Sequence, residues 1–181
     1  MNNYTVNELQ DRFKVLGYKW ISFQLIGIRA KDYAPNTFCD KFIFINNGRV
    51  YRFDSTTRPG SYYLLHLLNP KGAAVLKPGQ YLDSWTLGLH KNEYLAWVQT
   101  KPVTVFRDNN LNDSAEEVGF EDTGLFGIDI HRSNQFSISK LVDKYSAGCQ
   151  VFADPFQFNS FIDICKGSGL KSFSYTLLEE F

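Results

Sequence analysis

The chain of 181 residues carries 19 basic and 19 acidic side chains, so its formal net charge is zero. This balance gives no electrostatic basis for binding nucleic acid or an anionic membrane surface, and the length predicts one domain with a substantial core. Aromatic residues make up 16% of the chain, which favours a β-rich fold with an aromatic core over base stacking, since stacking needs a basic groove beside the rings.

The cysteines and the N-terminal stretch bear on the cellular compartment. Three cysteines are too few, and odd in number, for a disulfide framework, and Cys39 and Cys165 lie in apolar contexts typical of small core residues. The stretch MNNYTVNELQDRFKVLGYKW has neither the apolar run nor the basic flank of a signal peptide, and no segment stays apolar over the ~20 residues of a membrane helix. We expect cytoplasmic synthesis, no membrane insertion, and release by another agent if the protein acts on the cell wall.

The first predicted elements are a helix and a hairpin. Thr5 and Glu8 form the T-x-x-E pattern of a capping box, and Gly17 ends a run with helical apolar spacing, which predicts a helix at about residues 5–17. In KFIFINNGRVYRFD, two β-prone runs flank Asn47-Gly48, the dipeptide most typical of a tight hairpin.

Further strands are predicted along the middle of the chain. Turns at Pro59-Gly60 and Pro78-Gly79 each precede an aromatic run, SYYLLHLL and QYLDSW, and two more β-prone runs follow, EYLAWVQ and VTVFRD. Residues 108–123 are polar and acidic and predict a loop. The stretch DNNLNDSAEE lacks the glycine and the final glutamate of an EF-hand, so it predicts a solvated turn and not a calcium site.

The last part of the chain mixes strands and helices. GLFGIDIHR has the composition of a buried strand, SISKLVDK predicts a short helix, and SFSYTLL predicts a final strand. Asp154 before Pro155 indicates a helix N-terminus, and Gly167 ends that helix. The prediction is a single domain over residues 1–181, a mainly β sandwich or barrel with short peripheral helices, with its core at about residues 40–178 and the N-terminal helix as an extension.

Cys149 follows Ser146-Ala147-Gly148, a run too small and flexible to be chosen for packing. His131 ends a predicted strand eighteen residues earlier and can act as the base that a nucleophilic thiol needs. The amides of Gly148 and Cys149 are candidates for an oxyanion hole, since glycine lets the backbone turn without a Cβ. A small core residue and a hydrogen-bonded strand-end histidine are the structural alternatives for Cys149 and His131.

GIDIHR followed by YSAGCQV resembles the catalytic domain of the L,D-transpeptidase (YkuD-like) family, in which a histidine at a strand end precedes a Ser-x-Gly-Cys run. The likeness covers roughly residues 40–152 and includes FINNGRVYRFDSTTRPGSYYL, which is similar to a hairpin and turn upstream in that family. The chain departs from the family pattern at Arg132, where a small residue is usual, and at Val151, where arginine is often found.

The resemblance implies a cofactor-free enzyme whose partners are peptidoglycan stem peptides. Cys149 would attack the carbonyl between an L-centre and a D-residue, and His131 would take the thiol proton and return it to the leaving group. The backbone carbonyl of Arg132 would orient the imidazole, and the amides of Gly148 and Cys149 would hold the oxyanion. The acyl group would pass to an amine or to water, and hydrolysis suits a lysis enzyme of a bacteriophage or prophage.

Other residues have weaker claims on function. The candidates for substrate contacts are Ser146, Trp85 and Tyr81. A turn role for the serine and core packing for the aromatics are the alternatives. Asp129 lies two residues before His131 and would face the same side of a strand, where it orients the histidine or forms an ordinary salt bridge. His90 precedes a probable turn and is expected to be solvated, and His66 lies among apolar residues and is expected to be structural.

Two other classes of function remain open. The fold could serve as a non-catalytic cell-wall-binding or virion structural module in which Cys149 is a relic, or as a cysteine amidase with another substrate. The cysteines are too far apart for a zinc site, so no metal is expected.

Overall fold

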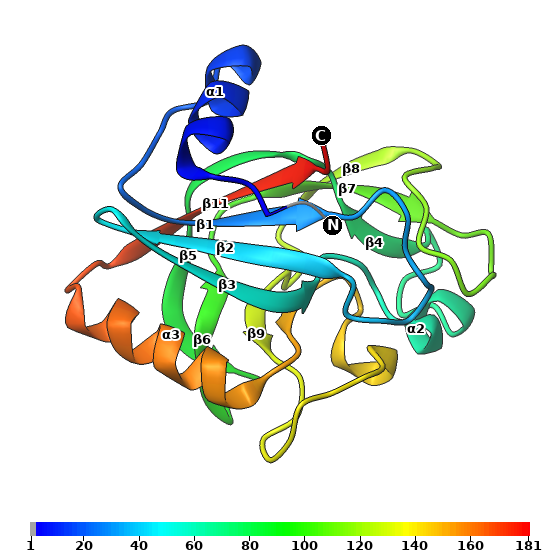
Figure 1. The fold of residues 1–181 in the computed structure, drawn as a ribbon. Coiled ribbons are helices and arrows are strands. Elements are labelled where there is room, and N and C mark those ends of the chain that lie inside the picture. The colour runs from blue at the N-terminus through cyan, green and yellow to red at the C-terminus, as the bar shows by residue number, and fades with distance from the viewer. Residues whose placement is uncertain (1–2) are drawn as a thin grey trace.

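A computed structural model describes residues 3–181, and its main feature is a closed barrel of eight strands (Figure 1). The strands follow one another around the barrel in the order β1-β11-β5-β6-β9-β10-β3-β2. Their bounds are β1 (Phe23–Arg29), β2 (Asp40–Asn46), β3 (Arg49–Thr56), β5 (Gly79–His90), β6 (Tyr94–Gln99), β9 (Ile130–Arg132), β10 (Gln150–Phe152) and β11 (Ser172–Glu179). A separate sheet has the order β4-β7-β8 and consists of β4 (Ala73–Leu76), β7 (Val103–Asp108) and β8 (Glu121–Gly124). Strands make up 39% of the chain and helices 18%, which confirms the mainly β prediction.

The two longer helices begin and end where their capping residues predict. The helices are α1 (Val6–Leu16), α2 (Ser61–Leu65) and α3 (Pro155–Gly167), with a 3₁₀ turn, η1, at Asp143–Tyr145. The Thr5 hydroxyl accepts from the Glu8 amide, the Glu8 carboxylate accepts from the Thr5 amide, and Gly17 follows α1 with a φ of 69°. The Asp154 carboxylate accepts hydrogen bonds from two amides in the first turn of α3. No helix within residues 3–181 combines the length and the apolar character that crossing a membrane requires.

The pairing of the strands determines where the chain places its loops. The predicted hairpin joins β2 to β3, and Asn47 and Gly48 have φ values of 47° and 90°, in the left-handed region that a tight two-residue turn requires. β9 and β10 are parallel neighbours, flanked by β6 and β3. Because parallel strands need a crossover connection, residues 133–149 return the chain from the end of β9 to the start of β10.

Aromatic side chains fill the barrel, as the composition suggested. The largest side chains with almost no exposed surface include Trp85, Trp97, Tyr175, Phe42, Phe44 and Phe173. α3 packs against the barrel through Phe158 and Phe161, whose ring centroids lie 5.4 and 5.1 Å from that of Phe152 on β10. Burial of rings of this size, in edge-to-face and stacked pairs, supplies much of the apolar area that stabilises the fold.

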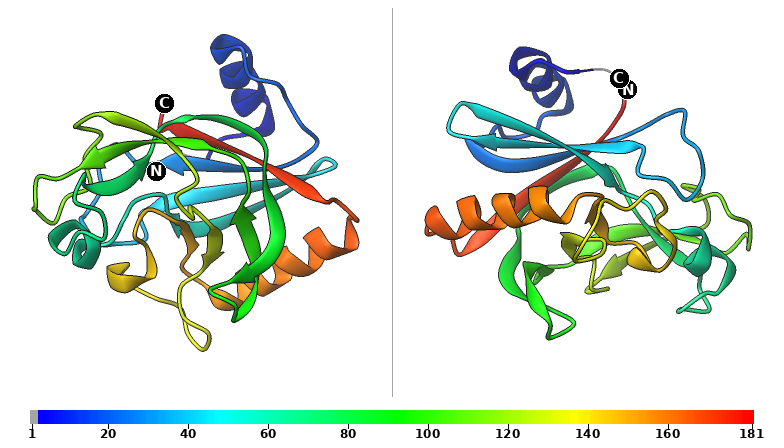
Figure 2. Two further views of the ribbon diagram at one scale, coloured as in Figure 1. Left: turned by 180° about the vertical axis from the view of Figure 1, so that it is seen from behind. Right: turned by 60° about the horizontal axis from the view of Figure 1, so that its bottom comes forward.

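α1 covers the outside of the barrel beside β1, β2 and β11 (Figure 2). Its buried residues Leu9 and Phe13 belong to a second apolar cluster together with isoleucines of β1 and β2. The two ends of the described chain meet next to it. The Tyr4 ring stacks on Phe181 at 4.2 Å, and the Tyr4 hydroxyl donates to the Phe181 carbonyl at 2.6 Å. The N-terminal helix is therefore packed onto the barrel through its own core.

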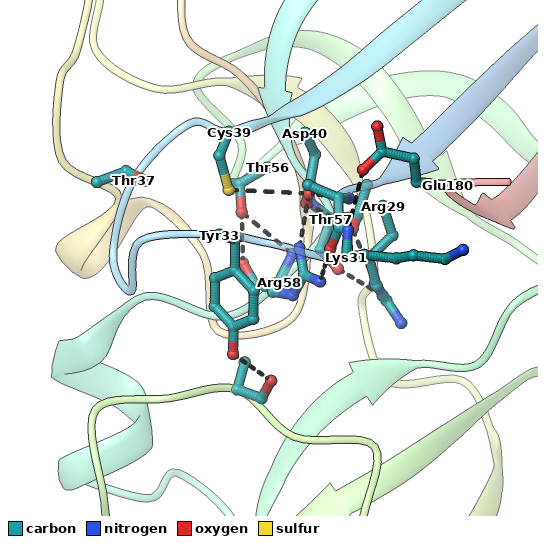
Figure 3. A network of polar contacts seen from close by, with 12 residues as sticks. Arg29, Lys31, Tyr33, Thr37, Cys39, Asp40, Thr56, Thr57, Arg58 and Glu180 are labelled. Carbon is teal, nitrogen blue, oxygen red and sulfur yellow. Dashed lines mark hydrogen bonds and ion pairs between the residues drawn. The ribbon is translucent and has the colours of Figure 1, made fainter. Parts of the chain in front are cut away.

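A buried polar network lies where β1 ends and β2 begins (Figure 3). Asp40 is fully buried and accepts hydrogen bonds from Arg58 Nη1 at 2.6 Å and from the amide of Ala30 at 2.9 Å. Its other oxygen accepts from both the amide and the hydroxyl of Thr57, each at 2.7 Å. Arg29 donates to the hydroxyl and the carbonyl of Thr57. Since every oxygen and guanidinium in this set is partnered, the network joins three segments of the barrel without leaving a buried charge uncompensated.

Two predicted elements are wrong. The run SYYLLHLL forms the short helix α2 and a turn in place of a strand, because α2 buries only Leu64, against the small cluster around β4. The segment SISKLVDK is irregular up to η1 and is not helical. Its backbone groups are taken by a distant residue: the amides of Val142 and Asp143 donate to the carbonyl and side-chain oxygens of Asn36, at 2.9 and 2.6 Å.

The predicted strand GLFGIDIHR is mostly irregular, and only its last part, β9, pairs within the barrel. Gln99 diverts the preceding residues, because its side-chain oxygen accepts hydrogen bonds from the amides of Phe126 and Ile128 at 3.0 and 2.9 Å. The predicted loop 108–123 ends earlier than expected, where β8 begins.

Candidate functional site

A tight turn before β10 presents Cys149. Gly148 has a φ of 132°, and a Cβ at this position would lie 2.4 Å from the carbonyl oxygen of Ala74, so only glycine fits. Ser146 has no exposed surface, and its hydroxyl accepts from the Gly148 amide at 3.1 Å and donates to the Cys149 carbonyl at 2.8 Å. Ser146 therefore holds the turn together and is too deeply buried to touch a substrate, which corrects its predicted binding role.

His131 lies on β9, beside the strand that follows Cys149. In the parallel pairing of β9 with β10, Val151 lies opposite His131. Cys149 is two residues before Val151, so it faces the same side of the barrel as His131. Neighbouring strands lie about 4.8 Å apart and two residues advance about 6.6 Å along a strand, which separates the two Cβ atoms by about 8 Å.

The imidazole of His131 is held through one of its two nitrogens. Nδ1 lies 2.7 Å from the carbonyl oxygen of Arg132 and therefore carries the proton, since a carbonyl can only accept. This is the contact that the resemblance implied for the Arg132 carbonyl. The Tyr94 hydroxyl lies 3.3 Å from Nδ1 and donates to the same carbonyl at 3.2 Å. Nε2 is buried and has no hydrogen-bond partner among the described residues, so it retains a free lone pair.

The thiol of Cys149 is turned toward a backbone carbonyl. Sγ donates to the carbonyl oxygen of Gly127 at 3.3 Å, and no hydrogen bond joins Sγ to the imidazole of His131. The amide of Gly148 is taken by the Ser146 hydroxyl, whereas the amide of Cys149 donates to no acceptor within residues 3–181. The pair thus shares a face of the barrel, but Cys149 must rotate about χ1 before its sulfur can give up a proton to Nε2.

Burial keeps both groups of the pair neutral. Burial lowers the pKa of His131 to about 3, with a further contribution from the neighbouring His90. Burial raises the pKa of the Cys149 thiol to about 12, and the carboxylate of Asp129 adds to the effect. At neutral pH the site therefore holds a thiol and a neutral imidazole and not a thiolate–imidazolium ion pair. Such a pair can work only by proton transfer during the attack itself.

His90 belongs to the site, which the sequence did not reveal. It is buried and not solvated as expected, because β5 runs on to His90 and the turn begins at the next residue. Its ring stacks on that of His131, with centroids 4.1 Å apart and planes at 17°. Its Nδ1 lies 2.8 Å from Asp129 Oδ2, and Asp129 Oδ1 accepts from the amide of Gln99 at 3.0 Å. Asp129 therefore orients the histidine that stacks on His131, and the pairing of β5 with β6 was the signal needed to see this.

The thiol and the imidazole line different cavities. The cavity that contains Cys149, here named the thiol cavity, has a volume of about 310 Å³, and its walls include Tyr63, Asn69, Arg107 and Phe126. The cavity that contains His131, here named the imidazole cavity, has a volume of about 340 Å³, and its walls include His90, Lys91, Tyr94, Arg132, Lys144 and Tyr145. A molecule that touches both groups must extend from one cavity toward the other.

The remaining aromatic candidates lie away from the pair. Trp85 has no exposed surface and its indole N–H donates to the Ile128 carbonyl at 2.6 Å, so it supports the loop before β9 from inside the core and does not line a groove. The Tyr81 hydroxyl donates to the Lys77 carbonyl at 2.6 Å, and its ring packs against Trp85. Neither aromatic lines a cavity that contains Cys149 or His131.

The other cysteines and the third histidine have structural surroundings. Cys165 is buried in the core, where burial raises its pKa to about 12. Cys39 is only partly buried, which differs from the expected core position, and its Sγ lies 3.9 Å from Asp40 Oδ1. His66 is exposed rather than enclosed by apolar residues and stacks on Tyr62 at 4.6 Å.

Within residues 3–181, no three His, Cys, Asp or Glu side chains are grouped so that they could hold a metal ion. No protein-family model, curated protein or solved structure matches the chain. The reactive groups that the site offers are a thiol, an imidazole with one free nitrogen, and a backbone amide without an acceptor, next to two cavities large enough for amino-acid side chains.

Proposed function

We propose that this chain is a cysteine-dependent enzyme acting on the L,D-peptide bonds of peptidoglycan stem peptides, with the fold and chemistry of the L,D-transpeptidases that it resembles. The observation that carries the proposal is the state of His131. Its Nδ1 is bound by the Arg132 carbonyl, and its Nε2 is buried without a partner on the face of the barrel that also carries Cys149. A purely structural histidine would have both nitrogens satisfied, whereas a general base needs one free lone pair near the proton that it takes.

The neutral pair supports a stepwise transfer of one proton. Sγ of Cys149 bonds to the substrate carbonyl carbon while its proton moves to Nε2 of His131, which creates the nucleophile only when a carbonyl is present. The peptide C–N bond then breaks as Nε2 returns that proton to the leaving nitrogen, and a thioester and a free amine result. Water or a second amine displaces the sulfur and gives its proton, through Nε2, back to the thiol.

One oxyanion donor is available in the resting turn. The amide of Cys149 has no acceptor and lies next to the attacking sulfur, so it is the donor that we assign to the developing negative charge. The amide of Gly148 can contribute only if the Ser146 hydroxyl releases it. A single donor of this kind accelerates acyl transfer by about 10²–10³.

A non-catalytic module that binds the cell wall or belongs to a virion is the second candidate. The hydrogen bond of Sγ to the Gly127 carbonyl favours it, because that contact is also what a resting structural cysteine would make. The two functions differ in whether any covalent change follows binding.

Incubation with purified muropeptides, followed by mass spectrometry, tests the proposal. We expect the wild-type protein to remove a terminal D-residue or to exchange it for an added D-amino acid, which also identifies water or the amine as acceptor. Cys149→Ala should give no product, and His131→Asn should slow the reaction by about 10²–10⁴, the usual contribution of a general base.

The matched control is Cys39→Ala, because Cys39 is also partly buried but lies in the network around Asp40. This variant should act like the wild type. If the wild-type protein leaves every muropeptide unchanged yet sediments with intact peptidoglycan, the binding module is the correct function. If it hydrolyses other amides and not muropeptides, the chain is a cysteine amidase with a different substrate.

A further inference from the structure

The imidazole cavity carries an excess of positive charge. Its walls include Lys91, Arg132 and Lys144, and Glu93 is the one acidic residue among them. None of the three cations forms an ion pair with a described residue. The cavity thus has the electrostatic character of a binding site for an anion.

Two of these cations are held in place by aromatic rings. The Arg132 guanidinium lies 3.9 Å from the centroid of the Tyr94 ring, and the Lys144 ammonium lies 4.2 Å from that of the Tyr62 ring. Cation–π contacts of this kind fix the position of a charge without using its N–H donors. The donors of Arg132 and Lys144 therefore remain available to a ligand, at lower entropic cost than free surface side chains.

A third feature of the cavity is an unpartnered polar atom. His131 is 3% exposed and lines this cavity, and its Nε2 has no hydrogen bond within the described residues. A positively charged cavity next to a free, buried imidazole nitrogen needs a ligand that offers an anion and a hydrogen-bonding nitrogen close together.

A D-amino acid released from the end of a stem peptide has these two groups. Its amine is the leaving nitrogen that receives the proton from Nε2, and its carboxylate is attached to the same α-carbon, so the two groups are about 3 Å apart by ordinary bond lengths. When the amine is at His131, the carboxylate must therefore lie within reach of the residue that follows, Arg132.

We propose that the imidazole cavity binds the free carboxylate of the D-amino acid that leaves, through Arg132 and Lys144 with support from Lys91. The acyl part of the substrate then lies in the thiol cavity. This assignment rests on the proposed function, and it adds a specificity: the enzyme cuts at a free C-terminal D-residue and works as a carboxypeptidase or as an exchange enzyme on that residue.

The reaction keeps its balance under this assignment. The C–N bond to the terminal D-residue breaks and the Sγ–C bond of the thioester forms, while the thiol proton moves through Nε2 to the leaving amine. Water then forms the new carboxylic acid of the shortened peptide and restores the thiol. No oxidant, reductant or further co-reactant is needed.

A pair of substrates tests the proposal by kinetics. We expect the wild-type protein to prefer a stem tetrapeptide that ends in D-alanine over the same peptide with a C-terminal D-alanine amide by about tenfold to a hundredfold in kcat/KM, the usual effect of a charge-assisted hydrogen bond. Lys144→Gln and Arg132→Gln should each reduce this preference, mainly through KM. Lys140→Gln is the matched control, because Lys140 is exposed in the same crossover segment but does not line the cavity.

A binding experiment separates this proposal from the proposed function. D-alanine added to the Cys149→Ala protein should shift the NMR signals of residues around Arg132, and D-alanine amide or inorganic phosphate at the same concentration should shift them far less. Turnover with equal rates on the acid and the amide refutes the carboxylate site and leaves the proposed function standing. Selective binding of D-alanine without any turnover refutes the proposed function and supports the carboxylate site.

Two further results would overturn the assignment. If phosphate binds as tightly as D-alanine, the cavity is a general anion site and recognises no amino acid. If the Lys144→Gln and Lys140→Gln proteins bind D-alanine equally well, the cation on the cavity wall does not contribute to recognition.

Discussion

Acidification provides a quantitative test of the environment that the structure assigns to His131. The folded-state pKa of this residue lies at about 3, and the ordinary value is 6.5. Below pH 6.5 the unfolded chain binds a proton that the folded chain does not bind, so the free energy of unfolding falls as the pH falls. Each pH unit in the window from 6.5 to about 3 removes about 1.4 kcal/mol, so acidification to pH 4 should remove about 3 kcal/mol through this residue alone.

Urea unfolding, followed by circular dichroism at pH 7 and pH 4, measures this loss. Carboxylates also titrate over this interval, so the informative quantity is the difference between the wild-type protein and His131→Asn. Asparagine can donate to the Arg132 carbonyl as Nδ1 does, but it does not titrate. We expect the variant to be less stable at pH 7 and to lose about 3 kcal/mol less than the wild type on acidification. His66→Gln, at an exposed histidine, controls for the removal of an imidazole.

Equal losses in the wild-type and His131→Asn proteins would refute the reasoning. They would mean that His131 is solvated, or takes a partner at Nε2, in the folded protein. In either case the argument for a buried general base with a free lone pair would fail, even if the barrel itself were correct.

Urea unfolding at pH 7 also checks three other contacts. Gly148→Ala should destabilise the protein by about 2–4 kcal/mol, because the left-handed backbone and the adjacent carbonyl leave no room for a Cβ, whereas Gly167→Ala, with open space around it at the end of α3, should be neutral or stabilise by up to about 1 kcal/mol. Asp40→Asn should remove about 3–5 kcal/mol, since it leaves the buried Arg58 guanidinium without its carboxylate at 2.6 Å, and a loss below about 1 kcal/mol would contradict that account. Asp154→Ala should reduce stability by about 1 kcal/mol through loss of the cap of α3, and an unchanged midpoint would show that the cap is not formed in solution.

The amino-acid sequence by itself determined the elements whose causes are local. Thr5 with Glu8, Asn47 with Gly48, and Asp154 before Pro155 each place their hydrogen bonds or dihedral preferences within a few residues, and α1, the β2–β3 hairpin and α3 lie where these signals predicted. The mainly β class followed from composition in the same way. Of the candidate site, the sequence indicated the turn at Gly148 and the candidate pair Cys149 and His131.

The tertiary structure alone decided the features that depend on distant partners. Gln99 bends the segment before β9, Asn36 takes the amides that a helix at SISKLVDK would have used, and α2 forms because no strand is free to pair with its sequence. His90 joins the site because β5 carries it to His131, a neighbour 41 residues away in sequence. The neutral states of the thiol and the imidazole arise from burial, and burial is a property of the closed barrel that no local pattern contains, because it depends on which strands become neighbours.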